Sequence, residues 1–149
     1  MHRIVVNVIT GEQSVVPLTP EEIAALPPPP TLGEVRETKL AALAAKRWEK
    51  ETGGMSYNGM SLATDAVSQT KYIGAVIGAQ MNPQSTLKWK LQDGTFVTLD
   101  AAAIVAVAFA VRGHVQACFD REATLATLIN TATTVEEIDA ININVGWPE

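Results

Sequence analysis

The sequence predicts an α+β fold: two β-hairpins packed with three to four helices, preceded by an N-terminal β-hairpin and a Pro-rich linker. Two dipeptides, Asn58-Gly59 and Asp93-Gly94, lie between apolar segments, which is a strong local signal for a hairpin turn. Helices are indicated by three Thr-x-x-Glu patterns that resemble N-terminal capping boxes. We therefore expect four segments: a hairpin over 1–19, a short helix and linker over 20–30, the α+β domain over 31–141, and a tail over 142–149.

The N-terminal hairpin is predicted from residues 3–9, which are β-branched and apolar on both faces. Thr10-Gly11 supplies the turn, and residues 12–18 form the return strand, with Pro17 confined to its edge or end. An isolated hairpin is only marginally stable in water. We therefore expect it to dock on another surface, in cis or in trans, through Ile4, Val6 and Val8.

The linker begins with a compact helix start. Thr19 is the expected N-cap, Pro20 occupies the first helical position, and Glu22 closes a capping box. The helix should end at Leu26, because the four prolines of 27–30 cannot continue it and favour an extended spacer. A ligand for an SH3-like module is the alternative, but no basic residue flanks the prolines, so a linker is favoured.

Four helices are expected in the 31–141 domain. The first begins at the capping box of Thr31 and runs to about Thr52, and the second runs from about Asp65 to Met81. The third covers roughly 101–130 after an Asp100 cap, and the fourth runs from Thr134 to about Ile141. Gly74 and Gly78 are expected to let the second of these helices pack closely on the sheet. The apolar stripe of the longest helix is expected to comprise Ile104, Val107, Val111, Cys118, Leu125 and Leu128.

The first hairpin of the domain has a well-defined expected register. A two-residue turn at Asn58-Gly59 pairs Tyr57 with Met60 and Met55 with Leu62. All four side chains then lie on one face of the hairpin.

The second hairpin is expected over 87–99. A two-residue turn at Asp93-Gly94 would pair Leu91 with Phe96 and Trp89 with Thr98. The face opposite Trp89 would then carry Lys88, Lys90, Val97 and Leu99.

Composition argues against several functions. The net charge is −5 and there is no Lys/Arg run, which disfavours nucleic-acid binding. The single cysteine, Cys118, cannot form an intrachain disulfide, which suits a reducing cytoplasm. The N-terminus lacks the pattern of a secretory signal. The longest apolar run, 101–111, ends at Arg112 and is shorter than the roughly 20 residues of a membrane span, so no membrane insertion is expected.

No catalytic, cofactor-binding or metal-binding residues are predicted. His114 and Cys118 lie one helical turn apart, but two ligands are too few for a closed zinc site. Asp93 and Asp100 flank one strand, and both have ordinary turn and cap roles. We therefore expect a protein that is not an enzyme and binds no cofactor.

The tryptophans are the better candidates for function, because tryptophan is enriched at interface hot spots. We single out Trp48, Trp89 and Trp147 as candidate interaction residues. Packing on the domain's own surface is the alternative, and it is equally favoured for Trp48.

Several of these features occur together in a known kind of domain. They are the Lys/Arg-containing helix before Gly53-Gly54, the 55–62 hairpin running into Thr64-Asp65, the segment Trp89…Asp93-Gly94-Thr95-Phe96-Val97…Leu99, and the long helix with His114. In this order they resemble a small, uncharacterised domain of tailed-bacteriophage tail proteins, from Thr31 to about Ile141. The opening, Val8…Thr10-Gly11-Glu12…Pro17-Leu18-Thr19, resembles the openings of short tail-gene proteins.

The resemblance implies a structural virion protein of a tailed phage. It would lie at the tail tip, baseplate or tail-fibre attachment region and assemble with tail-fibre or baseplate subunits after synthesis in the bacterial cytoplasm. It would also form a homo-oligomer, with a trimer expected because tail fibres are commonly trimeric. The first alternative is a tail-fibre assembly chaperone absent from the mature particle. A remoter one is a tail-associated glycan hydrolase, which would need paired carboxylates in a cleft.

Overall fold

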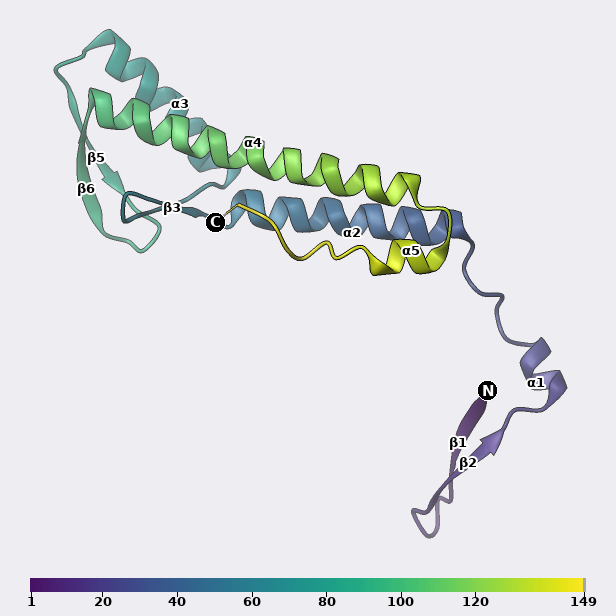
Figure 1. The fold of residues 1–149 in the computed structure, drawn as a ribbon. Helices are drawn as coiled ribbons and strands as arrows, with labels where there is room; N and C mark the ends of the chain where they lie inside the picture. Colours follow the sequence, from purple (N-terminus) through teal and green to yellow (C-terminus); the bar gives the residue numbers. More distant parts are fainter. Residues whose placement is uncertain (149) are drawn as a thin grey trace. The chain divides into compact units, whose positions relative to one another are not determined.

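The computed structural model describes residues 1–148, which form two compact units, one of Met1–Thr31 and one beginning at Leu32. Three separate two-stranded antiparallel sheets and five helices make up the two units, so the expected α+β class is confirmed (Figure 1). The two units are described separately below.

The N-terminal unit contains strands β1 (His2–Val6) and β2 (Gln13–Pro17) and helix α1 (Pro20–Ala24). The predicted hairpin is present, with Pro17 as the last residue of β2. Thr19 and Glu22 form the expected capping box. The helix ends at Ala24 and not at Leu26, because Ala25 already serves as its C-cap.

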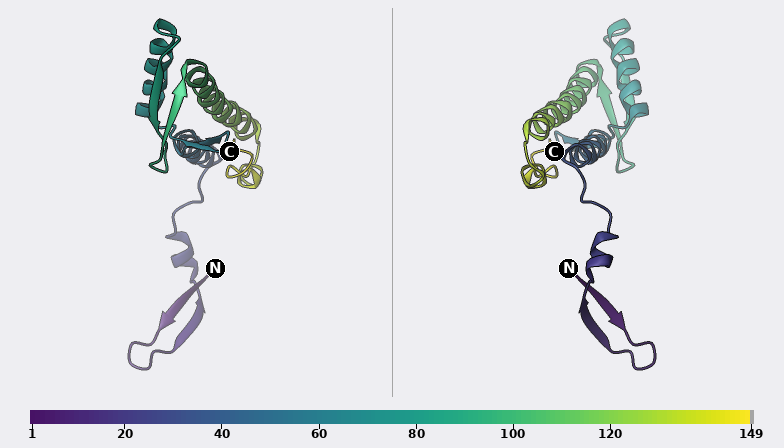
Figure 2. Two further views of the ribbon diagram at one scale, coloured as in Figure 1. Left: turned by 90° about the vertical axis from the view of Figure 1, so that its left-hand side faces the viewer. Right: turned by 90° about the vertical axis from the view of Figure 1, so that its right-hand side faces the viewer.

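The second unit is built around α4 (Ala101–Thr131), which packs along both α2 (Leu32–Thr52) and α3 (Ala66–Met81). The short helix α5 (Val135–Ala140) returns against α2 and α4. The views from either side agree that α2 and α4 lie side by side, with α3 on a different side of α4 (Figure 2). Asp100 caps α4, as the sequence predicts, and Asp65 is the N-cap of α3.

The buried stripe of α4 supplies more core residues than any other element. It comprises Ile104, Val107, Val111, His114, Cys118, Leu125 and Ile129. The prediction that Leu128 belongs to this stripe is wrong, since Leu128 is half exposed and Ile129 takes its place. Helix α4 is also long and apolar enough, by length and composition alone, to cross a membrane. Seven residues of α4 are nevertheless buried in the interior of this unit.

The hairpin of β3 (Met55–Tyr57) and β4 (Met60–Leu62) has the predicted register, with Tyr57 opposite Met60 and Met55 opposite Leu62. Asn58 and Gly59 both have positive φ, 50° and 77°, as the two-residue turn requires. Leu62 is fully buried in the core cluster that includes α3 and α4 residues.

The predicted register of the second hairpin, β5 (Thr86–Lys90) with β6 (Phe96–Asp100), is wrong by one residue. Trp89 pairs with Val97, and Lys90 pairs with Phe96. The loop has three residues, 92–94, because Gly94 N–H bonds Leu91 O and Leu91 N–H bonds Thr95 O. Gly94, at φ 89°, takes the left-handed position of a bulged turn.

This shift exchanges the faces of β6, because side chains alternate along a strand. Val97 and Leu99 lie on the same face as Trp89, and that face packs on the core. Phe96 moves to the face of the lysines and is 67% exposed. The expected placement of Val97 and Leu99 beside Lys88 and Lys90 is therefore wrong.

Gln92 connects the two hairpins of the second unit to each other and to the end of α2. Gln92 donates its backbone N–H to Ser61 O and its side-chain amide to Gly53 O. A Cβ at Gly54 would contact the terminal amide of Gln92, which would have to move. The positive φ of Gly54, 95°, is what favours glycine where the chain turns from α2 into β3.

Candidate interaction surfaces

The N-terminal unit leaves one apolar face of its hairpin uncovered. Ile4 pairs with Val15, and the two side chains are 66% and 69% exposed. The opposite face carries Arg3 and the half-buried Val16, and Arg3 forms an ion pair with Glu22 of α1. Helix α1 is therefore tied to one face only, and the Ile4 face remains open.

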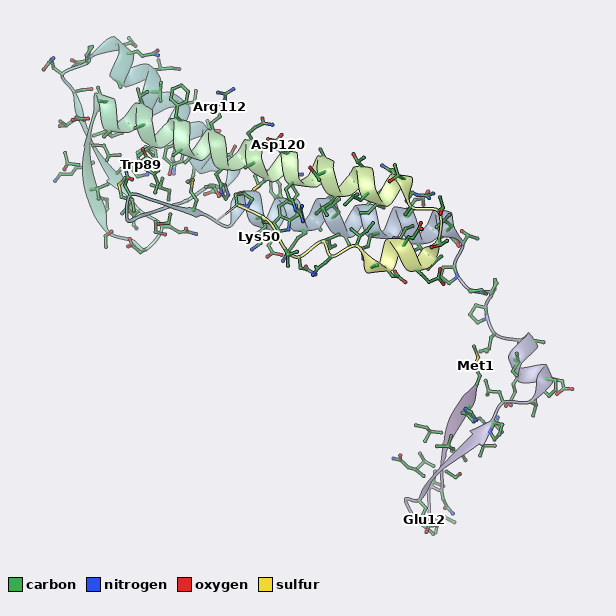
Figure 3. The ribbon with its side chains drawn as sticks, viewed as in Figure 1. Met1, Glu12, Lys50, Trp89, Arg112 and Asp120 are labelled. Atoms are coloured by element: carbon green, nitrogen blue, oxygen red, sulfur yellow. The ribbon has the colours of Figure 1, made fainter. Side chains whose placement is uncertain are left out.

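Two further properties of this unit favour docking. Among the described residues 1–31, none is buried. The sheet there consists of β1 and β2 alone, so each strand keeps one unpaired edge of backbone donors and acceptors. Val6 is half exposed and Val8, just beyond β1, is 95% exposed. Figure 3 shows Glu12 at the turn end of this hairpin and Met1 at its open end.

The three predicted tryptophans have different environments. Trp48 is 53% exposed on α2, with the Arg47 guanidinium 5.9 Å from its ring centroid. Trp89 points into the core and stacks on Tyr72. Trp147 donates its indole N–H to Ile143 O at 2.9 Å and packs on the Leu43 cluster. Contacts within the chain therefore account for Trp89 and Trp147, and Trp48 is the tryptophan that offers a free surface.

A charged network lies between α2 and α4. Arg47 pairs with Glu51 on its own helix and with Glu122 of α4, whose Oε2 lies 3.1 Å from its Nε. Its guanidinium also lies 4.6 Å from the Phe119 ring centroid. Glu51 is 7% exposed and also receives the Gln69 amide at 3.5 Å. This network joins α2 to α4, so we assign it a structural role.

His114 and Cys118 are buried beside this network. His114 Nε2 donates to Lys50 O at 3.1 Å, because a carbonyl can only accept. Lys50 O lies in the last turn of α2, where carbonyls lack a helical donor, so His114 completes the end of that helix. Its Nδ1 has no hydrogen-bond partner among the described residues. Cys118 Sγ lies 3.8 Å from Nε2, and burial raises the pKa of this thiol.

These groups do not form a metal centre. Over residues 1–148 no three His, Cys, Asp or Glu side chains are arranged to hold a metal ion. A polar hollow of about 430 Å³ lies between the end of α2 and the C-terminal segment. Its charged members are Glu49 and Lys50, and Glu49 is held by an ion pair with Lys46.

One surface was missed by sequence reasoning. Helix α3 exposes Ile73, Ile77 and Met81, which are 64%, 52% and 82% exposed. Lys71 is the only charged residue among its sixteen. That scarcity of charge on a helix of ordinary length is the signal that could have identified the surface from the sequence.

Comparison with known proteins places the second unit in a family. A family described as a domain of unknown function, DUF4376, matches residues 34–142. The chain belongs to the DUF4376 family. The match to DUF4376 starts in the first turn of α2 and ends just after α5, so it covers α3, α4, α5 and all but the first two residues of α2. No curated protein matches the chain, and neither does any solved structure.

The limits of the DUF4376 match separate the interaction surfaces into two groups. Trp48, Trp89 and the exposed face of α3 lie within the matched residues. Ile4, Val6 and Val8 lie outside them, as does Trp147. The N-terminal hairpin is therefore an addition to the DUF4376 domain in this chain.

Proposed function

We propose that this protein is a structural virion component of a tailed phage, located at the tail tip, baseplate or tail-fibre attachment region. It acts through assembly with other tail proteins and performs no catalysis. The observation that carries the proposal is the N-terminal unit, whose hairpin presents the uncovered Ile4–Val15 face and has no buried residue among those described.

The energetics of that unit favour a bound partner. A two-stranded hairpin is marginal alone, and burial of one valine or isoleucine side chain contributes about 1.5–3 kcal/mol. Ile4 and Val15 expose most of their surface, so docking would supply stabilisation that the unit lacks. The free strand edges add backbone hydrogen bonds as a second means of attachment, because a partner strand can extend the sheet.

The second unit needs no such help. Its two apolar clusters lie within residues 40–147, and the longer helices close around them. A folded domain joined to an attachment element is the organisation expected of an assembly component. The order of motifs between Thr31 and Ile141, which resembles a phage tail domain, supports the location in the tail.

The test is quantitative mass spectrometry of purified, intact phage particles that encode this protein. A fixed small-integer ratio to known tail proteins is the expected result. Absence from particles, combined with presence in the infected-cell lysate, would contradict the structural proposal and leave a tail-fibre assembly chaperone as the function.

The hairpin's role is tested with a matched pair of variants in phages carrying the altered gene. Ile4→Asp places a charge on the uncovered face and should reduce incorporation into particles. Ser14→Asp places the same charge on β2, on the opposite face, and should leave incorporation unchanged. Equal incorporation of both variants would show that this face is not the attachment surface.

A further inference from the structure

The outward face of α3 exposes several large apolar side chains of the second unit. Successive residues turn a helix by about 100°, so the apolar and small residues of this face share an arc of about 140°. They are Val67, Ile73, Gly74, Ile77, Gly78 and Met81. Tyr72 and Ala79 occupy the opposite, buried side.

The two glycines lie on the open side of α3. An added Cβ at Gly74 or Gly78 would meet no atom of the described chain within 4 Å. The prediction that these glycines allow close packing on the sheet is therefore wrong. A glycine inside a helix costs about 1 kcal/mol relative to alanine. Two of them, one turn apart on an outward face, let another helix approach the backbone closely.

Helix α4 extends this face. Ile73 and Ile77 line one side of an apolar groove of about 370 Å³, and Phe109 and Val115 of α4 line the other. Phe109 is 65% exposed at the edge of the groove. Arg112, which also lines it, projects outward from α4 (Figure 3). The surface therefore combines a projecting aromatic ring with a hollow.

The extent of this surface matches an interface between two copies. Four apolar side chains of α3 and Phe109 are each exposed by half or more. At about 100 Å² apiece they present about 500 Å² of apolar surface, as large as the largest patch on a typical monomer. With the intervening small residues, the area approaches the roughly 800 Å² that each partner buries in a standard interface.

We propose that this face is the contact between two copies of the chain, related by a two-fold axis that crosses α3 near Gly74 and Gly78. A two-fold contact requires a surface complementary to itself. This face qualifies because it carries both the groove and the exposed Phe109. Its charged neighbours are Lys71 at the edge of α3 and Arg112, which projects outward from α4. The contact is separate from the N-terminal hairpin and does not rest on the proposed function.

The position of Lys71 at the edge of this face is compatible with the two-fold contact. Lys71 is five residues from the midpoint of the two glycines, so an antiparallel crossing separates the two copies of Lys71 by about 15 Å along the helices. Like charges at that separation are largely screened at physiological ionic strength, where the Debye length is about 8 Å.

The first test is the mass of the full-length protein in solution, measured by light scattering after size-exclusion chromatography. We expect twice the 15.9 kDa of one chain. Ile77→Asp should give a single chain, because it buries a charge at the contact. Phe96→Asp is the matched control, since Phe96 is equally exposed on the lysine face of β6, and it should keep the double mass.

The glycines provide a second, independent readout. Gly74→Ala combined with Gly78→Ala should raise the melting temperature of the single chain, because alanine favours the helix, and should weaken association by about tenfold or more. A disrupted fold would instead lower the melting temperature. Opposite changes in melting temperature and association are therefore specific to close helix contact.

Three outcomes would overturn the proposal. They are a wild-type mass of one chain at high concentration, a mass of three chains, or a double mass that persists in Ile77→Asp. Ile4→Asp should retain the double mass. Loss of association in that variant would transfer the contact to the N-terminal hairpin, and would contradict the proposal for α3 without affecting the proposed attachment role of the hairpin.

Discussion

Trp89 stacks on Tyr72 with ring centroids 4.7 Å apart and an interplanar angle of 20°. The pair joins β5 to α3. The other main connection between this hairpin and α3 is through α4, which contacts both β6 and α3. Tyr72 is held in turn by its hydroxyl, which donates to Ala63 O at 3.1 Å. The stack therefore fixes the second hairpin against the helical core. The three-residue loop at 92–94 places Val97 and Leu99 of β6 on the same face as Trp89.

Replacement of Trp89 by alanine should lower the free energy of unfolding by about 3 kcal/mol, because large aromatic deletions in a core cost about that much. Chemical denaturation followed by circular dichroism would measure the change. Trp48→Ala is the matched control and should cost less than about 1 kcal/mol, since Trp48 is exposed. Similar losses in both variants would show that the stack does not carry this stabilisation.

Removal of residues 1–30, which keeps Thr31 at the start of α2, should leave the melting temperature of the remainder nearly unchanged. The apolar clusters of the second unit contain no residue from that segment. Differential scanning calorimetry of the full chain and of residues 31–149 would make the comparison. A drop of more than about 4 °C, which corresponds to roughly 1 kcal/mol in a domain of this size, would contradict independent folding.

Local chemistry made most of the elements predictable. The capping boxes at Thr19 and Thr134, the Asp100 cap and the Asn58-Gly59 turn are determined by residues within four positions of one another, and all are present. Asp93-Gly94 fits a two-residue and a three-residue loop equally well from its sequence. The choice between them depends on burying Val97 and Leu99, which is a tertiary effect, and the sequence pattern therefore misassigned that register.

The interaction surfaces were harder to predict for the same reason. Ile4, Val6 and Val8 could be selected because they belong to an isolated hairpin, which is only marginally stable alone. Trp89 and Trp147 were selected by residue type alone, and tertiary contacts bury much of each. The face of α3 was missed because periodicity shows that Tyr72 and Ile73 lie on different sides of a helix, but does not show which side the rest of the chain covers.

Replacement of Arg47 by methionine should cost about 3 kcal/mol, because it leaves Glu51 as a buried charge without its partner. The double variant Arg47→Met with Glu51→Met should recover to within about 1 kcal/mol of the wild type, since paired apolar side chains replace buried ion pairs at little cost. Glu122 is more exposed and can be solvated in both variants. A double variant less stable than the single one would show that the charges contribute net stability.

Cys118 should give stability a specific dependence on alkaline pH. Burial, followed by the negative charge of Glu51, raises the pKa of the Cys118 thiol above its ordinary value of 9.0. Between that value and the higher pKa of the folded state, the unfolded chain loses this proton and the folded chain keeps it. The free energy of unfolding should therefore fall as pH rises above 9.0.

Urea denaturation at several pH values from about 8 to about 10 would measure this decline, because the unfolded thiol titrates in that range. Cys118→Ala removes the titrating group and should show a shallower decline. Tyr72 serves as an internal reference, since burial also raises its pKa above 10.0. Its contribution to the decline should begin at higher pH and be the same in the wild type and in Cys118→Ala.

In the wild type, a thiol reagent at about pH 8 should react with Cys118 only as fast as the domain opens. Rapid labelling of the folded protein would show that the thiol is accessible and would remove the basis for the expected pH dependence.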